Sequence, residues 1–196
     1  MAKKTNADRQ ENAFQAMIWP VLVLVIICIA CSAALAALNK VTAPVIEENT
    51  RIRTLESYVA VLPEGTSADS LTELTVSEAS LSDGVTGAVS APDGSIAVQV
   101  AAAGYSGKAV TVYVAFDASG SIANLLVDAS TQTAGIGSAV GEESFTSGFA
   151  GFSASGHVSD GTPVDAVAGA TYSSNAVYNA VNAAIDCYNN DLKGAA

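Results

Sequence analysis

The sequence predicts an α+β fold: a single N-terminal transmembrane helix followed by one mixed α+β domain with an antiparallel sheet. Three observations predict it. An uncharged apolar run lies near the N-terminus, segments rich in β-forming residues and separated by glycine turns lie in the middle, and apolar residues at helical spacing lie near the C-terminus. With 196 residues, the chain has room for one domain plus appendages.

The apolar run predicts a membrane anchor. No charged residue occurs between Ala13 and Leu38, and Met17–Leu38 would span roughly 33 Å as a helix, enough for a bilayer core of about 30 Å. We place the transmembrane helix at residues 13–39, after a cytoplasmic N-terminus of residues 1–12. Basic residues are more frequent before the run than after it, which favours an exported body on the outer, periplasmic or extracellular face of a bacterial inner or plasma membrane. Membrane lipid is then one partner.

Two alternatives to a retained anchor stay open. Ala34-Leu35-Ala36 weakly resembles a signal-peptide cleavage site, and Ile29-Ala30-Cys31 weakly resembles a lipoprotein attachment site. Cys28 and Cys31 lie inside the apolar run and Cys187 is alone near the C-terminus, so the chain has no internal disulfide framework. We interpret the two cysteines of the run as packing residues.

Residues 40–63 predict a juxtamembrane helix that starts at Pro44 and ends before Pro63. Its apolar stripe consists of Ile46, Ile52, Leu55 and Val59. We assign residues 64–196 to one domain. The polar stretch of residues 64–94 is expected to form loops and one or two short strands.

Strand signals are clearer after this stretch. Three strands are predicted: Ser95–Ala103, Ala109–Phe116 and Ser121–Val127. Turns are expected at Gly104–Gly107 and at Asp117–Gly120, the second closing a hairpin. Two helices are expected to follow, over Glu142–Phe149 and Ser173–Asn189. Val177, Val181 and Ile185 give the last helix an apolar face, which we expect Tyr178 and Tyr188 to flank as core residues.

Composition and charge narrow the possible functions. The formal net charge is −11 at pH 7, and from Val41 onward seventeen acidic residues face only four basic ones. A body this acidic repels nucleic acid, so we expect no nucleic-acid partner. The single histidine, His157, lies in a loop rich in glycine and serine, which favours a surface position. No zinc-binding, cysteine–histidine or phosphate-loop motif occurs in the sequence, so we assign no catalytic residue and no metal ligand.

The segment Asp165–Val177 contains the most informative residues. Gly169 and Ala170 are small and precede an expected helix start, where backbone N–H groups can hold a phosphate. Thr171 would then present its hydroxyl to that phosphate. The alternative is a plain turn, with Thr171 or Ser173 as the helix N-cap.

A second small-residue segment, Thr131–Gly137, follows the third strand. Gly135 and Gly137 allow close approach of a ligand, and Ile136 lies between them. Taken alone, such a glycine pair is more often just a turn.

Three segments, in order, resemble the FMN-binding subunits of the Rnf and Nqr respiratory complexes. Asn39–Asn49 is similar to the phrase that follows the anchor in the Rnf G subunit. The loop Gln132–Gly137 resembles Glu-Thr-Pro-Gly-Leu-Gly, with Gln132 in place of the glutamate. Residues 165–173 resemble the flavinylation motif Asp-x-x-Ser-Gly-Ala-Thr-x-Thr/Ser, with Ala168 in place of the serine. The short chain is more similar to the Rnf G subunit than to the longer Nqr C subunit.

The resemblance implies that residues 64–196 form an FMN-binding domain with FMN attached to Thr171 as a phosphoester. It implies that Asp165, Gly169 and Ala170 form the recognition motif for an ApbE-like flavin transferase, which would be a partner in maturation. The remaining cofactor-binding residues that it implies are Tyr172, Ser173 and Ser174 near the phosphate, and Tyr105, Thr133, Gly135, Ile136 and Gly137 near the ring.

The function implied is that of an electron-transfer subunit, not catalytic alone, in an Rnf-type ferredoxin:NAD oxidoreductase that moves Na+ or H+. The other membrane subunits of that complex would be its partners. Two alternatives remain at this point: a stand-alone exported flavoprotein for extracellular electron transfer, and an anchored structural protein without a cofactor.

Overall fold

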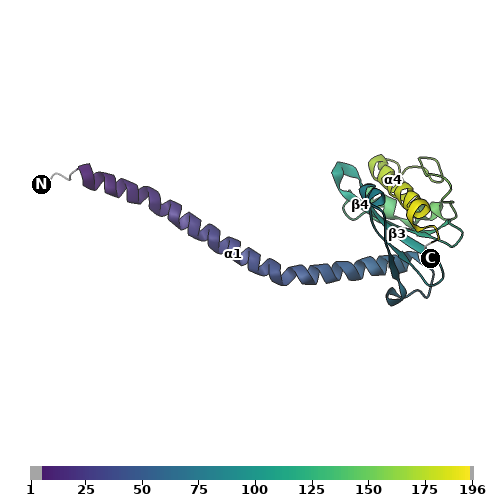
Figure 1. Ribbon diagram of the computed structural model, residues 1–196. Helices are drawn as coiled ribbons and strands as arrows, with labels where there is room; N and C mark the ends of the chain where they lie inside the picture. Colours follow the sequence, from purple (N-terminus) through teal and green to yellow (C-terminus); the bar gives the residue numbers. More distant parts are fainter. Residues whose placement is uncertain (1–5, 195–196) are drawn as a thin grey trace. The chain divides into compact units, whose positions relative to one another are not determined.

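The computed structural model describes residues 6–194, with side chains described from residue 17 onward, and divides into two compact units, Met1–Ile52 and Arg53–Ala196 (Figure 1). The first unit is the greater part of helix α1 (Asn6–Val61). The second contains the end of that helix, a five-stranded sheet and a C-terminal helix. Each unit is described in turn.

Helix α1 is a candidate membrane anchor. Within the described residues it is the one helix long and apolar enough to cross a membrane, with a mean hydropathy of 3.0 over its most apolar window. Every residue from 17 to 50 is exposed, because no other described part of the chain packs against this stretch of the helix. Large apolar side chains such as Trp19, Leu24 and Ile29 are therefore available to lipid.

The expected fresh helix start at Pro44 is wrong, because α1 continues through both Pro20 and Pro44. Each proline removes only one backbone N–H donor. The regular hydrogen bonds of the turns before and after it keep the helix continuous. The expected end holds, since α1 stops at Val61, just before Pro63.

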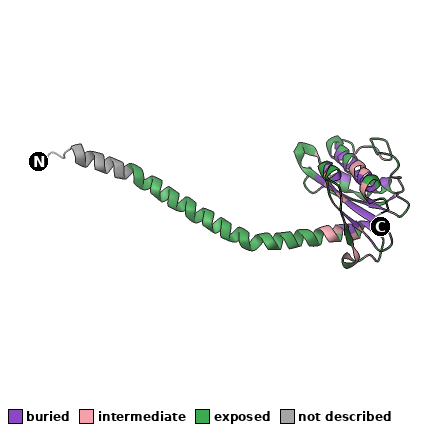
Figure 2. Ribbon diagram, viewed as in Figure 1, coloured by how far each residue is buried: buried purple, intermediate pink, exposed green. Residues whose placement is uncertain are grey.

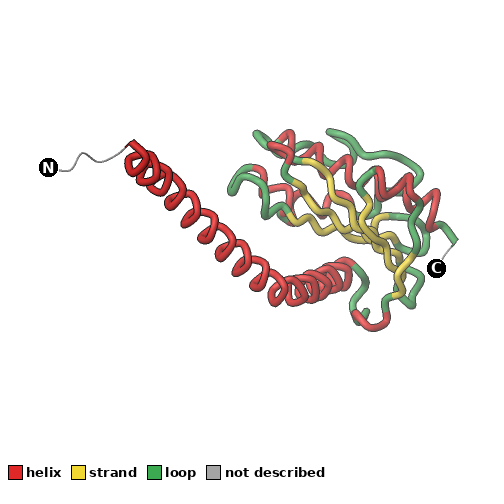
Figure 3. Tube along the Cα trace, turned by 60° about the vertical axis from the view of Figure 1, so that its left-hand side comes forward, coloured by secondary structure: helices red, strands yellow, loops and turns green. Residues whose placement is uncertain are grey.

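The sheet is an antiparallel meander with the strand order β1-β2-β3-β4-β5, and Figure 3 draws its strands in yellow. Its strands are β1 (Thr72–Leu74), β2 (Val85–Ser90), β3 (Ile96–Ala103), β4 (Ala109–Phe116) and β5 (Ile122–Asp128). The three strands predicted most clearly are confirmed to within one residue at each end. The polar stretch before them holds two strands and also a short helix, α2 (Glu78–Ser82), which sequence reasoning missed.

Tight turns fix the register of the central strands. Between β4 and β5, the Asp117 and Gly120 N–H groups donate to the carbonyls of Ser121 and Asp117, and Gly120 has φ 78°. That positive φ explains the glycine, as the hairpin prediction required. Between β3 and β4, Ala103 pairs with Ala109 around the short helix η2 (Tyr105–Gly107).

Helix α4 (Thr171–Cys187) covers one face of the sheet and completes the main core (Figure 2). Val177, Val181 and Ile185 are buried against strand residues, as their spacing predicts. Tyr178 and Tyr188 are core residues, which confirms the expectation for them. The predicted helix at 142–149 consists of α3 (Glu143–Thr146) and a 3₁₀ turn, η4 (Ser147–Phe149).

The end of α1 covers the other face of the sheet. Along β4, Val112 and Val114 belong to the main core, whereas the alternating Tyr113 and Ala115 belong to a second core cluster. That cluster contains Tyr58, Val61 and Leu62, and the rings of Tyr58 and Tyr113 lie 5.4 Å apart, edge to face. The last turns of α1 are therefore part of the domain core.

Candidate functional site

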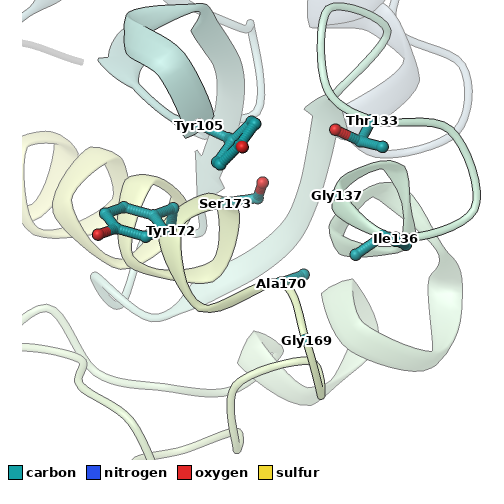
Figure 4. Close-up of a pocket in the computed structure, with 8 residues that line it drawn as sticks. All are labelled: Tyr105, Thr133, Ile136, Gly137, Gly169, Ala170, Tyr172 and Ser173. Atoms are coloured by element: carbon teal, nitrogen blue, oxygen red, sulfur yellow. The ribbon is translucent and has the colours of Figure 1, made fainter.

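A cavity of about 380 Å³ opens where three segments of the domain meet (Figure 4). The segments are the η2 turn after β3, the loop after β5, and the start of α4. The lining residues are Tyr105, Thr133, Ile136, Gly137, Gly169, Ala170, Tyr172 and Ser173. This volume lies within the range of about 300–1,000 Å³ typical of small-molecule sites.

The start of α4 forms one wall of the cavity. Ala170 is the N-cap residue, and its methyl side chain cannot form a capping hydrogen bond. Thr171 is the first helical residue. The N-cap alternative for Thr171 or Ser173 is therefore wrong, because both residues lie inside the helix. Thr171 is exposed, and its hydroxyl makes no hydrogen bond to any other described residue.

The first turn of α4 also carries backbone N–H groups that could bind an anion. Ser174 N–H donates to the Ala170 carbonyl at 2.9 Å, which begins the helical pattern. Within the described part of the chain, the N–H groups of Thr171, Tyr172 and Ser173 have no acceptor. Unsatisfied N–H groups at the positive end of a 17-residue helix suit a phosphate.

Apolar side chains at the rim could contact a flat aromatic ligand. Tyr105 and Tyr172 lie on one side of the cavity, and Ile136 lies on the other (Figure 4). The two tyrosine rings are 6.1 Å apart with an interplanar angle of 63°. All three residues are at least half exposed, so their apolar surfaces are open to a ligand.

Behind this wall, the side chain of Gln132 joins the three segments. Gln132 is 7% exposed. Its Oε1 accepts hydrogen bonds from Tyr105 N–H and from the Ser173 hydroxyl, both at 3.0 Å. Its Nε2 donates to the Lys108 carbonyl at 3.1 Å and to Thr131 Oγ1 at 3.0 Å. All the hydrogen-bonding capacity of this buried amide is used across η2, the loop and α4, with two bonds at each end.

Two glycines leave room for this network. A Cβ on Gly137 would lie 2.8 Å from Ser173 Oγ and 3.0 Å from Gln132 Cβ. A Cβ on Gly104 would lie 2.7 Å from Gln132 Oε1. Both positions therefore require glycine, because there is no space for a larger side chain.

Comparison with known families agrees with this geometry. Residues 104–186 match the family model described as FMN-binding domain. This segment of the chain is therefore similar to FMN-binding domains. The matched segment includes all eight residues that line the cavity. No curated protein matches the chain.

The residues around the cavity fit FMN. The three N–H groups at the α4 start that have no acceptor among the described residues are suitable donors to its phosphate. Tyr105, Tyr172 and Ile136 offer apolar surface to its ring system. A domain of this kind indicates a flavoprotein that takes part in electron transfer.

A row of polar side chains on α4 holds the segment that leads into Thr171. Ser174 Oγ accepts from Val167 N–H at 3.0 Å, and Tyr178 Oη donates to the Val164 carbonyl at 2.9 Å. One turn further on, Asn182 bonds both the N–H and the carbonyl of Val158, at 2.7 and 3.0 Å.

The row ends at the surface. Asp186 lies 2.8 Å from His157 Nε2, and both side chains are about half exposed. This confirms the expected surface position of His157. Because Ser174, Tyr178, Asn182 and Asp186 are spaced by four residues, they form one stripe along the helix.

The domain brings together eight of the twelve residues that the sequence marked as cofactor-binding, and these are the eight that line the cavity. Thr171 adjoins two of them, with its side chain exposed. Ser174 is buried and bonded to Val167 N–H, while Asp165 and Gly135 are exposed and do not line the cavity.

Sequence reasoning missed the central place of Gln132. It located this residue only as the counterpart of a glutamate in related loops. The polar side chain ahead of a glycine pair was visible, but its burial depends on three segments far apart in the sequence.

Proposed function

We propose that this protein is a membrane-anchored electron-transfer subunit whose FMN is linked covalently to Thr171. The FMN-binding domain and the candidate anchor α1 support the general assignment. The covalent link is supported by one observation above all: an exposed hydroxyl at the first position of α4, without a hydrogen bond to any described residue, between two residues that line the cavity.

The residues of the chain would bind and orient the cofactor. The N–H groups of Thr171, Tyr172 and Ser173 would donate to the phosphate, and the loop residues Thr133 and Ile136 would flank the ring. Bound FMN supplies the capacity to accept and donate electrons, which the side chains lack. A phosphoester between the FMN phosphate and Thr171 Oγ forms with the net loss of one water. It would prevent loss of the cofactor by dilution on the outer face of a membrane.

The covalent link is tested by co-expression with a flavin transferase. Denaturing gels of the wild-type chain should show a fluorescent flavin band, and Thr171→Ala should abolish it. Thr171→Ser, which keeps a hydroxyl, should retain part of the signal. Thr133→Ala removes another exposed hydroxyl at the cavity and should leave the signal in place. Persistent fluorescence in Thr171→Ala would refute the link at this residue.

The proposed setting is an Rnf-type ferredoxin:NAD oxidoreductase that moves Na+ or H+, with the FMN-binding domain on the outer face. The juxtamembrane phrase Asn39–Asn49 and the order of the motifs support this setting. Purification of the native protein from membranes should recover several multispan subunits together with the fluorescent chain. Recovery of the fluorescent chain alone, under mild detergent conditions, would instead favour a stand-alone exported flavoprotein.

A further inference from the structure

We infer that Gln132 is a positioning residue that also keeps the wall behind the FMN site uncharged. The midpoint potential of the flavin is thereby higher than it would be with a glutamate in the same place. This inference rests on the proposed function, because it requires FMN in the cavity. It assigns to Gln132 a role in tuning the electron-transfer chemistry rather than in binding alone.

The position of the amide is the first argument. Its Oε1 is one hydrogen bond away from Tyr105 and from Ser173, and both residues line the cavity. The side chain itself is 7% exposed, so water screens it poorly. A charge at this atom would therefore act strongly on a group bound in the cavity.

The second argument concerns the chemistry of the four hydrogen bonds. A carboxylate could accept from Tyr105 N–H and Ser173 Oγ, but it could not donate to the Lys108 carbonyl or to Thr131 Oγ1. The observed partners therefore select an amide over a carboxylate at this position. Selection of the amide leaves a polar wall without a negative charge.

The third argument concerns the effect of that choice on a flavin. Reduction brings electrons into the cavity, and a nearby negative charge opposes any increase in negative charge. A charge within about 4–6 Å typically shifts the equilibrium of a protein group by about tenfold or more. A tenfold shift corresponds to about 30 mV for a two-electron couple. A neutral Gln132 therefore favours the reduced flavin relative to a glutamate in the same place.

The experiment compares the FMN-loaded full-length wild type with Gln132→Glu and Gln132→Met at pH 8, by reductive titration with dithionite in the presence of reference dyes. Gln132→Glu should lower the midpoint potential by about 30 mV or more once its carboxyl is ionised, which the two retained donors favour and burial opposes. Gln132→Met is neutral and of similar size, so it should leave the potential within a few millivolts of wild type.

A second readout separates positioning from charge. Gln132→Met leaves the partners of the amide unpaired, so it should lower the midpoint of denaturant unfolding of the flavin-free chain. An unchanged potential in Gln132→Glu, or an equal shift in both variants, would overturn the inference.

If Gln132→Glu does not fold, Thr133→Asp places a carboxylate at the exposed lip of the cavity instead. It should lower the potential by less, because water screens an exposed charge. No decrease in that variant at low ionic strength, where screening by salt is weakest, would overturn the inference. A wild-type chain without FMN would refute the proposed function itself, which is a different outcome from an unshifted potential in a loaded variant.

Discussion

Thr171 and Gln132 differ in burial, and this difference separates their roles. The hydroxyl of Thr171 is exposed and unbonded within the described residues, as the proposed covalent link requires. The amide of Gln132 is buried and fully bonded, so it can shape the site but cannot react. The proposals for covalent attachment and for tuning of the flavin thus concern an exposed residue and a buried one.

Substitution of Gly137 tests how closely the wall of the cavity is packed. Its φ is not in the positive range, so only space argues for glycine here. We expect Gly137→Ala to press on Ser173 and Gln132, to lower the free energy of unfolding by about 1–3 kcal/mol, and to reduce FMN incorporation. Denaturant unfolding and in-gel fluorescence measure the two effects.

Gly156→Ala is the matched control, since its new Cβ would meet only Phe152, at 3.6 Å. It should be nearly neutral in both measurements. Equal effects of the two substitutions would contradict a closely packed wall at Gly137.

At the scale of elements, the polar stripe on α4 holds residues 154–167 in place, a segment that contains no helix or strand. Apolar residues of the helix face the sheet, while the polar stripe binds the backbone of this segment. One helix therefore positions both the core and the approach to Thr171.

Asn182 makes the central pair of bonds in this stripe. We expect Asn182→Ala to cost about 1–3 kcal/mol in the free energy of unfolding, because it leaves the part-buried Val158 N–H without its acceptor. Hydrogen exchange at the Val158 amide should accelerate as well. Asn179→Ala, at an exposed position on the same helix, should change neither quantity. Slow exchange at Val158 in Asn182→Ala would show that the stripe does not hold the segment.

A carboxylate joins the end of the chain to α2. Asp191 Oδ2 accepts from Ser80 Oγ at 2.6 Å, Ser77 Oγ at 2.9 Å and Ser77 N–H at 3.0 Å. These bonds, that from Ser80 first, hold the pKa of Asp191 below its ordinary value of 3.8. A carboxyl with a lowered folded-state pKa stabilises the fold above its unfolded pKa, and this contribution is lost as the pH falls through the folded value.

We therefore expect Asp191→Asn to be less stable than wild type at neutral pH, with a difference that shrinks as the pH falls below about 4. Denaturant unfolding of the full chain in detergent, followed by tyrosine fluorescence, measures this difference across pH. Asp69→Asn changes an exposed carboxylate that makes no side-chain hydrogen bond within the described residues, and should match wild type throughout. A difference for Asp191→Asn that stays constant into acid would contradict the linkage.

At the scale of the whole molecule, local patterns were sufficient to predict the long apolar helix, three strands and the last helix. Val177, Val181 and Ile185 carry a strong helical period, and β3 to β5 are rich in β-forming residues. The continuity of α1 through Pro44 was not predictable, because a proline inside a long helix and one at a helix start look alike in sequence.

The candidate site was predictable in its parts but not in its assembly. Glycine and threonine motifs marked the eight residues that line the cavity. Gln132 was invisible as a central residue, because its burial depends on Tyr105, Lys108 and Ser173, which lie 24 to 41 positions away. Long-range contacts of this kind leave no local period.

The mass of the intact chain, purified from membranes after co-expression with a flavin transferase, tests the central claim most directly. The proposal predicts the full chain, with α1 retained, plus one FMN less one water, and tandem fragmentation should place the added mass on Thr171. An unmodified chain in the presence of an active transferase, or a flavin on another residue, would contradict it.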